Sequence, residues 1–480
     1  MTQANDMTTH TGEFFIGGAW VAPATSTATH PLVDPSTGVQ HGTVALGNGD
    51  DVNAAVAAAK AAFPTYSQST VAERTALIER ILGGYMARVD DFARAISLEI
   101  GAPAGFASAL QAPVAAMTMQ EMLRTLGEYP FEQQQDGMTV VREPIGVCAL
   151  IAPWNWPMHQ VVLKVIPALA AGCTMILKPS ENTPISALIL AEVFDAAGVP
   201  AGVFNLVNGN GPDVGRALAQ HPDIAMISFT GSTRAGVQVA KDSANTIKRV
   251  TQELGGKSAN IILPDADLDA SVRGGVAACM ANSGQSCNAP TRMLVPAALH
   301  DDAVAIAAAA ADAITVGRPN DEGAQMGPIA NEAQFEKVRS LIQVGIDEGA
   351  TLVAGGPDRP AGLDDGFFIR PTVFGNVSND MRIAQEEIFG PVLCILPYED
   401  LDEAVAIAND SPFGLSGYVQ SGDPVAARKV ASRLRTGNVM INGANPLPGM
   451  PFGGFKQSGN GRAWSHYGLE EFLEIKAIVG

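Results

Sequence analysis

Short apolar runs separated by helical stretches dominate the chain after Glu143. The runs have strand length and lack polar alternation, as expected of strands buried on both faces. Alternation of such strands with helices predicts a parallel, doubly wound sheet, whose ligands bind beyond the carboxyl ends of the strands. The predicted strands are Gly146–Ile151, Cys173–Leu177, Val203–Val207 and Ile224–Phe229, and the predicted helices are His159–Ala171, Pro184–Ala197 and Asp213–His221.

A second block of strands and helices runs from about Gly255 to Gly454. No internal repeat of fixed period is visible, so we expect a distinct domain and not a copy of the first. Its candidate strands are Ala259–Ile262, Arg292–Val295, Thr351–Ala354, Val392–Leu396 and Leu415–Val419, with Ala-rich helices such as Asp301–Ala313 between them.

The ends of the chain have their own patterns. Residues 1–12 are polar and Thr-rich, which predicts a loose tail, and Asp50–Lys60 and Thr70–Leu110 read as helices. Two strand-like segments, Gly137–Arg142 and Glu471–Val479, belong to neither block. Because an unpaired edge strand usually needs a partner, we expect these segments to make subunit contacts.

Composition narrows the class of protein. Of the 480 residues, 47% are hydrophobic and only 16% are charged, which is typical of a folded globular protein with a large core. The net charge of −19 argues against nucleic acid or an anionic membrane as the partner, since phosphate binding needs clustered Lys and Arg. The most apolar stretch, Val161–Leu177, contains Lys164 and Pro167 and is too short for a membrane span.

The first basic residue is Lys60, so the start of the chain lacks the charged segment of a secretory or transit peptide, and a cytoplasmic protein is expected. The five cysteines contain no CxxC pair and their number is odd, which suits neither a disulfide framework nor a thiolate metal site. No metal site is predicted. A cysteine with a role here would act as a single thiol.

Cys287 is the best candidate for that thiol. It lies in the polar, turn-like segment GQSCNAP, whereas the other four cysteines lie in apolar runs. A cysteine in a loop with small neighbours can act as a nucleophile if a base is near. Glu253, in ELGGK, is a candidate base, although most glutamates at such turns are simply solvated. Asn155 lies between two tryptophans and two prolines, and its amide could donate to an oxyanion.

The segment TGSTRAG, residues 230–236, follows a predicted strand and opens a helix. Small residues let the backbone approach a ligand, and free N–H groups at a helix start suit a pyrophosphate. The segment is not a GxGxxG fingerprint, and an ordinary Gly-rich turn is the alternative.

Taken together, these segments resemble the aldehyde dehydrogenase superfamily. Cys287 follows Glu253 by 287 − 253 = 34 residues, as the family pattern requires, and the resemblance extends from FFIGGAWV (14–21) to the last predicted strand. The matching motifs, in the family's order, are PWNWP (153–157), KPSE (178–181), FTGSTRAG (229–236), ELGGKSA (253–259), GQSC (284–287), EEIFGPV (386–392) and PFGGFKQSGNGR (451–462).

The resemblance implies an α/β fold with a Rossmann-type parallel-sheet cofactor domain (1–122 and 143–254) and an α/β catalytic domain (255–454). Residues 123–142 and 463–480 would form a small, strand-based oligomerisation element, giving a homodimer or homotetramer. The Cys287 thiolate would attack the aldehyde, with the oxyanion held by Asn155 and the Cys287 N–H. After hydride transfer to the nicotinamide, water activated by Glu253 would cleave the thioester and release a carboxylic acid.

Lys164 matches a family lysine near the thiol, with an exposed helix face as the alternative. Lys178 and Glu181 would contact the adenine-side ribose. A carboxylate there favours NAD over NADP, although Lys178 could accommodate the extra phosphate and NADP remains an alternative. The implied cofactor contacts in full are Ile151, Ala152, Pro153, Trp154, Lys178, Ser180, Glu181, Gly211, Phe229, Thr230, Gly231, Ser232, Leu254, Glu387 and Phe389.

The substrate pocket implied by the resemblance has no Arg or Lys, so neutral aliphatic or aromatic aldehydes are expected rather than acidic semialdehydes. Its walls would be Trp156, His159, Gln160, Leu163, Ser286, Asn288, the loop 445–450 and Phe452, with Trp156 and Phe452 around the substrate.

One position departs from the family pattern. Many members have a glutamate after Gly461-Arg462 that is thought to carry protons away from the base, whereas this chain has Ala463. Two other functions stay open from the residues alone. One is a thiol esterase or acyltransferase that uses Cys287 and Glu253 without redox chemistry, and the other is a non-catalytic dinucleotide-binding protein.

Overall fold

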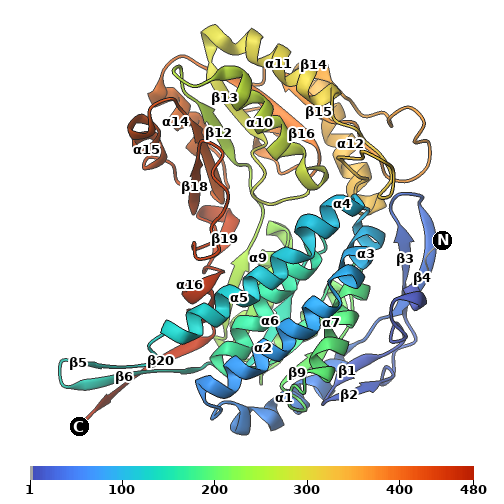
Figure 1. The fold of residues 1–480 in the computed structure, drawn as a ribbon, viewed down its shortest axis with the longest axis vertical. Coiled ribbons are helices and arrows are strands. Elements are labelled where there is room, and N and C mark those ends of the chain that lie inside the picture. The colour runs from blue at the N-terminus through green and yellow to red at the C-terminus, as the bar shows by residue number, and fades with distance from the viewer. Residues whose placement is uncertain (1–3) are drawn as a thin grey trace.

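The computed structural model describes residues 4–480, and its strands form two large sheets with helices on their faces (Figure 1). The first sheet has the order β19-β11-β10-β7-β8-β9-β1-β2, and its five central strands, from β11 to β9, are parallel. These five are β7 (Val147–Ile151), β8 (Thr174–Lys178), β9 (Phe204–Leu206), β10 (Met226–Thr230) and β11 (Arg249–Glu253), and the antiparallel edges are β1 (Phe14–Ile16), β2 (Ala19–Val21) and β19 (Gly459–Asn460).

Helices cover both faces of this sheet, as the apolar strands require. The core of one face contains side chains from α2 (Val71–Ala87), α3 (Val89–Ile100), α5 (Pro113–Glu128), α6 (Pro157–Ala171) and α7 (Pro184–Ala196). The core of the other face contains side chains from α1 (Gly49–Tyr66), α8 (Arg216–Gln220) and α9 (Thr233–Ser243). The doubly wound parallel sheet predicted from the sequence is therefore confirmed.

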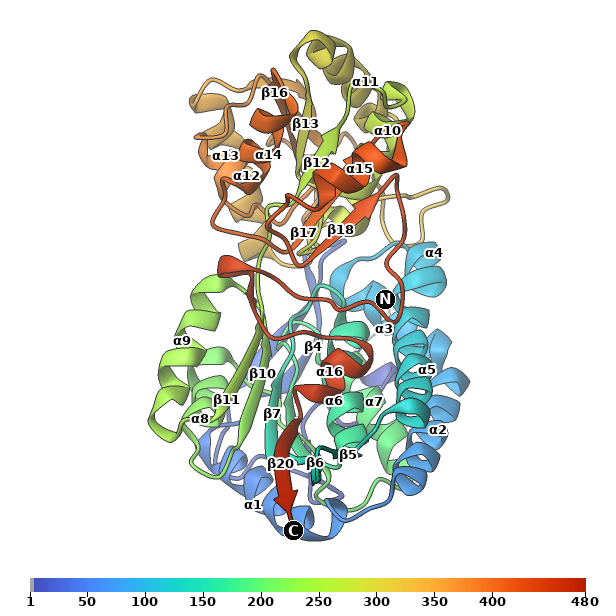
Figure 2. The same ribbon diagram turned by 90° about the vertical axis from the view of Figure 1, so that its left-hand side faces the viewer.

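The second sheet has the order β14-β15-β16-β13-β12-β17-β18 and is parallel except for β14. Its strands are β12 (Ala259–Ile262), β13 (Arg292–Pro296), β14 (Thr351–Ala354), β15 (Thr372–Gly375), β16 (Val392–Tyr398), β17 (Ser416–Gln420) and β18 (Asn438–Ile441). One core contains α10 (Leu268–Met280) and α11 (His300–Asp312), and the other contains α12 (Glu332–Asp347), α13 (Arg382–Gln385), α14 (Leu401–Asn409) and α15 (Pro424–Ala431). The two sheets lie one above the other in Figure 2, with the chain passing between them.

The remaining elements connect or extend this body. A hairpin of β3 (Thr29–Asp34) and β4 (Val39–Ala45) lies beside α3. Between α3 and α5 are the short helix α4 (Ala104–Phe106) and a π-helical turn (Ala107–Gln111). Two more short helical turns, Gly211–Gly215 and Ala281–Gly284, precede α8 and the segment with Cys287, and α16 (Ser465–Glu470) precedes the last strand.

The two strand-like segments that the sequence assigned to neither block pair with each other. β20 (Leu473–Val479) runs antiparallel to β6 (Met138–Pro144), which also pairs with β5 (Glu132–Gln135). Each of the two predicted strands therefore has a pairing partner within the same chain. Residues 123–128 belong to α5 and 465–470 to α16, so only parts of the predicted ranges 123–142 and 463–480 are strands. We call β5, β6 and β20 the arm.

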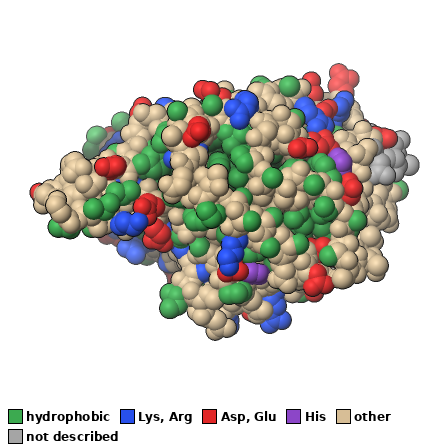
Figure 3. Space-filling model, turned by 90° about the horizontal axis from the view of Figure 1, so that it is seen from below, with side chains coloured by type: hydrophobic (Ala, Val, Ile, Leu, Met, Phe, Trp, Pro, Cys, Tyr) green, Lys and Arg blue, Asp and Glu red, His purple; other side chains and the backbone are tan. Residues whose placement is uncertain are grey.

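The outer edges of β5 and β20 pair with no other strand within residues 4–480. Three large apolar side chains of β20 are exposed, namely Ile475, Ile478 and Val479. Seen from below, hydrophobic side chains lie among polar ones on the arm, which projects at the left of Figure 3.

The predicted loose tail is wrong for residues 4–12, and residues 1–3 lie outside the described part of the chain. Ala4 is buried, and the hydroxyl of Thr8, which is also buried, donates to the Glu192 carboxylate. A small buried side chain and a hydroxyl with a partner hold this polar segment in place. No helix within residues 4–480 is long and apolar enough to cross a bilayer.

Candidate active site

Cys287 follows a sharply turned segment that holds it next to the first sheet. Asn282, Ser283 and Gly284 all have positive φ angles (53°, 56° and 71°). A side chain on Gly284 would overlap the Gly390 carbonyl, 2.1 Å from the position of its Cβ. Gly256 is equally constrained, since its Cβ would lie 2.3 Å from the Cys287 carbonyl oxygen. The two glycines let the ELGGK and EEIFGPV segments lie against the cysteine.

The thiol of Cys287 is not activated by its surroundings. Burial raises its pKa to about 12, and the nearby carboxylates of Glu387 and Glu253 act in the same direction, while backbone N–H groups oppose them. The neutral thiol is therefore the dominant form at neutral pH in this structure.

Asn155 links the PWNWP loop to the GQSC segment. Its Nδ2 donates to the Gln285 carbonyl at 2.9 Å, and its backbone carbonyl accepts from Asn282 Nδ2 at 2.9 Å. Trp156 Nε1 donates to Ser286 Oγ at 2.9 Å. The two loops that the sequence singled out thus lie side by side, although 130 residues separate them along the chain.

Glu253 ends β11, next to Thr230 at the end of β10. The alternative that it is a solvated turn residue is wrong, because both carboxylate oxygens are buried and neither has a hydrogen-bond partner within residues 4–480. Gly453 makes room for them, since its Cβ would lie 2.7 Å from Glu253 Oε1. Burial raises the pKa of Glu253 well above its usual value, Lys164 and Arg462 oppose this, and Glu471 adds to it.

Lys164 lies on α6 and is buried, so the alternative of an exposed helix face is also wrong. Its Nζ donates to Thr230 Oγ1 at 2.7 Å and to Ser228 Oγ at 3.2 Å. Burial lowers its pKa to about 8, against the opposing effect of Glu253. A lysine and a glutamate with shifted pKa values therefore share one buried region behind the thiol, which is typical of functional sites.

The residues expected to hold the cofactor follow the carboxyl ends of the parallel strands. Ala152, after β7, donates its N–H to the Lys178 carbonyl at 3.1 Å, and Gly231, after β10, donates to the Glu253 carbonyl at 3.1 Å. Ser232 caps α9, with Oγ accepting from the Ala235 N–H. Ile151, Pro153, Trp154, Ser180, Glu181, Phe229, Thr230 and Leu254 lie in or directly after the ends of β7, β8, β10 and β11, and Gly211 opens the π-helical turn after β9.

Lys178 is buried and already has protein partners. Its Nζ donates to the carbonyls of Gly209 (2.6 Å) and Pro179 (3.0 Å) and lies 3.5 Å from Glu181 Oε2. Glu181 is half-buried at the edge of the sheet. The Glu181 carboxylate can accept hydrogen bonds from ribose hydroxyls, whereas it would repel an additional phosphate. The residues present therefore fit a dinucleotide without a 2′-phosphate.

Glu387 and Phe389 reach the same edge from the second sheet. Glu387 Oε1 accepts the Gly256 N–H at 2.9 Å, and burial raises the pKa of this carboxyl. The Phe389 ring meets Trp154 edge to face, with centroids 5.4 Å apart. Phe389 has a φ of 59°, so the loop turns sharply to present its ring.

A cavity of about 480 Å³ opens at the thiol. It is lined by Cys287 together with all seven pocket residues named from the sequence, Trp156, His159, Gln160, Leu163, Ser286, Asn288 and Phe452, and by Asn445, Pro446 and Pro448 of the predicted loop. The sequence missed the opposite wall, made by Leu110, Val114, Met117, Thr118, Glu121 and Met122, and the residues Ile166, Pro167, Trp464, Ser465 and Gly468.

One signal could have found part of this wall. Leu110, Val114, Met117 and Glu121 are spaced as neighbours on one helix face, and Leu110 and Met117 are exposed although apolar. A helix face that stays apolar and uncovered indicates a binding surface.

The cavity walls are mostly apolar, contain the rings of Trp156, Phe452 and Trp464, and are almost uncharged. Phe452 stacks on Trp464 with centroids 5.5 Å apart, and His159 lies 5.7 Å from Trp464. Burial lowers the pKa of His159 to about 4, so this imidazole is neutral at neutral pH. The one carboxylate in the lining, Glu121, accepts from Arg124 at 2.7 Å.

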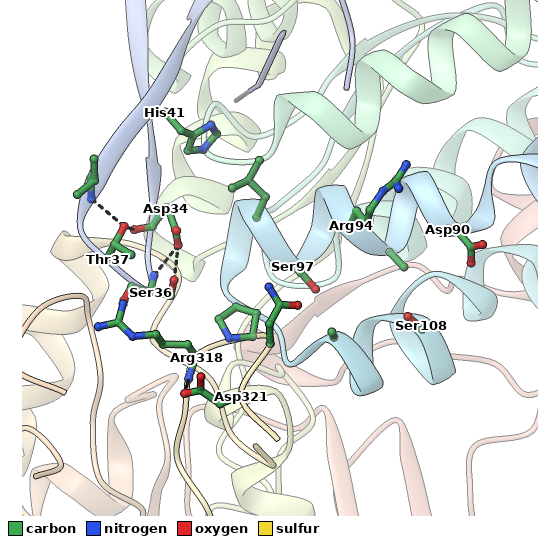
Figure 4. Close-up of a pocket in the computed structure, with 16 residues that line it drawn as sticks. Asp34, Ser36, Thr37, His41, Asp90, Arg94, Ser97, Ser108, Arg318 and Asp321 are labelled. Atoms are coloured by element: carbon green, nitrogen blue, oxygen red, sulfur yellow. Dashed lines mark hydrogen bonds between the residues drawn. The ribbon is translucent and has the colours of Figure 1, made fainter. Parts of the chain in front are cut away.

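A larger cavity, of about 690 Å³, lies away from the thiol, between the β3–β4 hairpin, α3 and the loop 318–321 (Figure 4). Its charged groups largely have partners. Asp34 Oδ1 accepts from Ser36, and Arg318 donates to the Ser36 carbonyl and to Asp365. None of the residues predicted to act in catalysis or binding lines it.

Comparison with known proteins shows what the chain resembles. The model of the aldehyde dehydrogenase family matches residues 20–478. A 3-succinoylsemialdehyde-pyridine dehydrogenase from a Pseudomonas species is 52% identical over 469 residues, which cover 98% of each chain. The crystal structure of a mutant aldehyde dehydrogenase C from Pseudomonas syringae, complexed with NAD+ and octanal, has a TM-score of 0.97 at 52% identity, covering 98% of this chain and 97% of that one. A Mycobacterium tuberculosis aldehyde dehydrogenase complexed with NAD+ has a TM-score of 0.95 at 41% identity and 98% coverage of both chains.

Proposed function

The chain belongs to the aldehyde dehydrogenase family, and from this premise we propose which residues carry out the reaction and which aldehydes they accept. It is an oxidoreductase that converts an aldehyde to a carboxylic acid with NAD as cofactor. One observation carries the residue assignment. Cys287 opens onto the aromatic cavity, and its environment is shared with the buried carboxylate of Glu253.

Cys287 is the nucleophile. The thiol first loses its proton to water. The thiolate sulfur then forms a bond to the aldehyde carbon, while the electron pair of the C=O π bond moves to the oxygen, which becomes an oxyanion. The amide of Asn155 has two N–H groups, of which Gln285 takes one, so the second can donate to the oxyanion together with the Cys287 N–H. Bound NAD would supply the acceptor for the hydride that leaves this carbon.

Glu253 is the base that activates water for cleavage of the thioester. Its oxygens have no hydrogen-bond partner in the described part of the chain, so their lone pairs are free to accept from water. Burial raises its pKa well above the usual value for a glutamate, which makes the carboxylate a stronger base than an exposed glutamate. Lys164 positions this region through Thr230 and Ser228 and places a positive charge near the carboxylate.

Residues after the strand ends hold the cofactor. Lys178 and Glu181 contact the adenine-side ribose, Gly231 and Ser232 the pyrophosphate, Glu387 the nicotinamide ribose, and Phe389 and Thr230 the nicotinamide. Because Lys178 Nζ is already committed to two carbonyls and to Glu181, a 2′-phosphate would gain little from it, and NAD is preferred over NADP. The first sheet with residues 1–122 and 143–254 thus serves as the cofactor domain, and residues 255–454 as the catalytic domain.

Neutral aliphatic or aromatic aldehydes are the substrates. The cavity has the volume of a small-molecule site, no Lys or Arg in its lining, and a neutral His159. The names of the relatives agree with this class, since one structure contains octanal and one relative is named for a pyridine semialdehyde.

The arm forms a contact between subunits in a dimer or tetramer, because its outer edges are unpaired and β20 exposes apolar side chains.

The assay for this proposal measures NADH absorbance with a series of neutral aldehydes, including octanal and benzaldehyde. We expect turnover with NAD, weaker turnover with NADP, and complete loss in Cys287→Ala, which should still bind NAD. Absence of turnover with every aldehyde would contradict the proposal. Ester cleavage without NAD, in the absence of any aldehyde oxidation, would instead support a thiol esterase.

A further inference from the structure

A second, inner cavity lies behind Glu253. It has a volume of about 30 Å³ and is bounded by Lys164, Thr230, Glu253, Arg462, Ala463 and Glu471 among others. A space of this size, with buried charged groups in its lining, holds about one or two water molecules. It shares Gln160, Leu163, Phe452 and Gly468 with the substrate cavity, so it lies directly behind the wall of that cavity.

An outer pocket of about 360 Å³ lies on the far side of Glu471 and is open to solvent. It is lined by Arg249, Tyr467, Glu470, Leu473, Glu474 and Ile475 as well as by Arg462 and Glu471. Arg462 and Glu471 are the two residues that line both this pocket and the inner cavity. They therefore separate the buried base from solvent.

Of these two side chains, only the glutamate can both take up and release a proton. An arginine side chain stays protonated in proteins, and Arg462 Nη1 is held by the carbonyls of Gly461 and Gly454. Glu471 is half-buried, and burial raises its pKa above the usual value for a glutamate, while Arg462 and Arg249 oppose the shift. Its Oε1 accepts the Arg462 backbone N–H at 2.9 Å, and among residues 4–480 no hydrogen bond reaches its other oxygen.

Two glycines leave the space between the two carboxylates open. The Cβ position of Gly453 lies 2.7 Å from Glu253 Oε1 and 2.8 Å from the Gly461 carbonyl oxygen. The Cβ position of Gly461, in turn, lies 3.0 Å from Glu471 Oε1. Side chains at either position would fill the space through which the carboxylates are connected.

We propose that Glu471 receives the proton that Glu253 takes from water and passes it to solvent through the outer pocket. The inference rests on the assignment of Glu253 as the base. In the step, a water in the inner cavity accepts the proton of the Glu253 carboxyl and gives one of its own to the Glu471 carboxylate. Glu253 returns to its ionised form, and Glu471 then releases the proton to a solvent water.

The neighbouring groups are consistent with this route. Lys164 faces Glu253 from α6, and Arg249 faces Glu471 from β11, donating through Nη1 to the Glu471 backbone carbonyl at 2.7 Å. Both cations favour ionised carboxylates, so they oppose the effect of burial and assist release of the proton. Ala463 contributes only a methyl group to the inner cavity, so it cannot take part.

Glu471→Gln tests the proposal, because an amide oxygen can still accept the Arg462 N–H while the side chain can no longer carry a proton. Glu470→Gln is the matched control, since Glu470 lines the outer pocket but not the inner cavity. Rapid mixing with NAD and octanal gives the first-turnover burst of NADH, and quenching followed by mass spectrometry gives the decay of the acyl-enzyme.

We expect Glu471→Gln to keep the burst within about twofold and to slow acyl-enzyme decay about tenfold or more. A small proton carrier such as formate or imidazole should restore the decay, and Glu470→Gln should behave as wild type. Acyl-enzyme decay within about twofold of wild type, a burst lost in parallel with decay, or slowed decay that no carrier restores would each overturn the proposal.

Glu253→Gln separates this inference from the function on which it rests. Arrested acyl-enzyme decay in Glu253→Gln with normal decay in Glu471→Gln removes only the proton route. Normal decay in Glu253→Gln removes the assignment of the base, and the proton route with it.

Discussion

At Cys287 the two nearby carboxylates oppose ionisation of the thiol. Burial is the largest cause of its raised pKa, and Glu387 and Glu253 follow. The thiolate must therefore be generated during the reaction cycle and not stored in the resting protein. Such a resting state protects a reactive cysteine from oxidation, because oxidants and alkylating agents attack the thiolate.

This view predicts how Cys287 reacts in the protein without cofactor. Alkylation by iodoacetamide should be slow at neutral pH and should rise with pH beyond pH 9, since the pKa is about 12. Glu387→Gln removes a negative charge near the sulfur, lowers the thiol pKa and should increase the rate at pH 8 by roughly threefold or more. Mass spectrometry of the alkylated peptide measures the rate. Glu386→Gln, at an exposed neighbour paired with Arg382, serves as the control.

Individual residues also show how far the sequence could predict the site. Cys287, Glu253 and Asn155 stood out by their unusual segments, and the structure brings these segments together. The sequence could not decide whether Lys164 and Glu253 were exposed, because their burial depends on Phe452, Arg462 and Gly468, which return from the far end of the chain. Nothing in the sequence marked Glu471 as a functional residue. Its approach to Glu253, which lies far away along the chain, depends on the space left by Gly453 and Gly461.

Among the elements, the central strands of the first sheet show what the sequence could predict. β7, β8 and β10 are fully buried strands whose predicted ends agree with the structure to within two residues. β15 and β18 have four residues each and were missed, although β12 and β14, which are equally short, were predicted with the bounds that the structure has. A run of four residues has too little periodicity to separate a strand from a loop in every case. The wall of the substrate cavity made by α5 was missed for another reason, namely that helix packing depends on contacts distant in sequence.

The arm leads to a prediction about assembly. Ile475 and Val479 are 71% and 78% exposed and lie on the same face of β20. If this face contacts another subunit, Ile475→Asp with Val479→Asp buries two charges at the contact and should shift the protein to a smaller assembly. Light scattering after size-exclusion chromatography measures the mass. Val425→Asp, at a 74% exposed residue of α15, is the control and should leave the mass unchanged. An unchanged mass in the arm variant would place the contact elsewhere.

The charge of the whole molecule has a consequence for cofactor binding. A net charge of −19 surrounds a site that takes an anionic dinucleotide. Long-range repulsion slows the approach of an anion and is screened by salt, while the local contacts after β8 and β10 act at short range. The overall field and the local site therefore oppose each other.

We expect the association rate of NAD to rise by roughly twofold or more when ionic strength increases from about 10 mM to about 150 mM. NADP, which carries more negative charge, should show a steeper dependence, and the KM of octanal, which is neutral, should change little. Stopped-flow fluorescence measures the association rates. A rate that falls with added salt would show that positive charge near the site dominates the field.

The wall shared by the substrate cavity and the inner cavity constrains how this enzyme can change its preference during evolution. A substitution at Gln160, Leu163 or Phe452 that admits a new aldehyde also reshapes the space behind Glu253. Selectivity gained at these positions is thus coupled to the speed of hydrolysis. Leu110 and Met117 line the substrate cavity but not the inner cavity. Substitutions at these two positions can therefore change substrate specificity without changing the rate of hydrolysis.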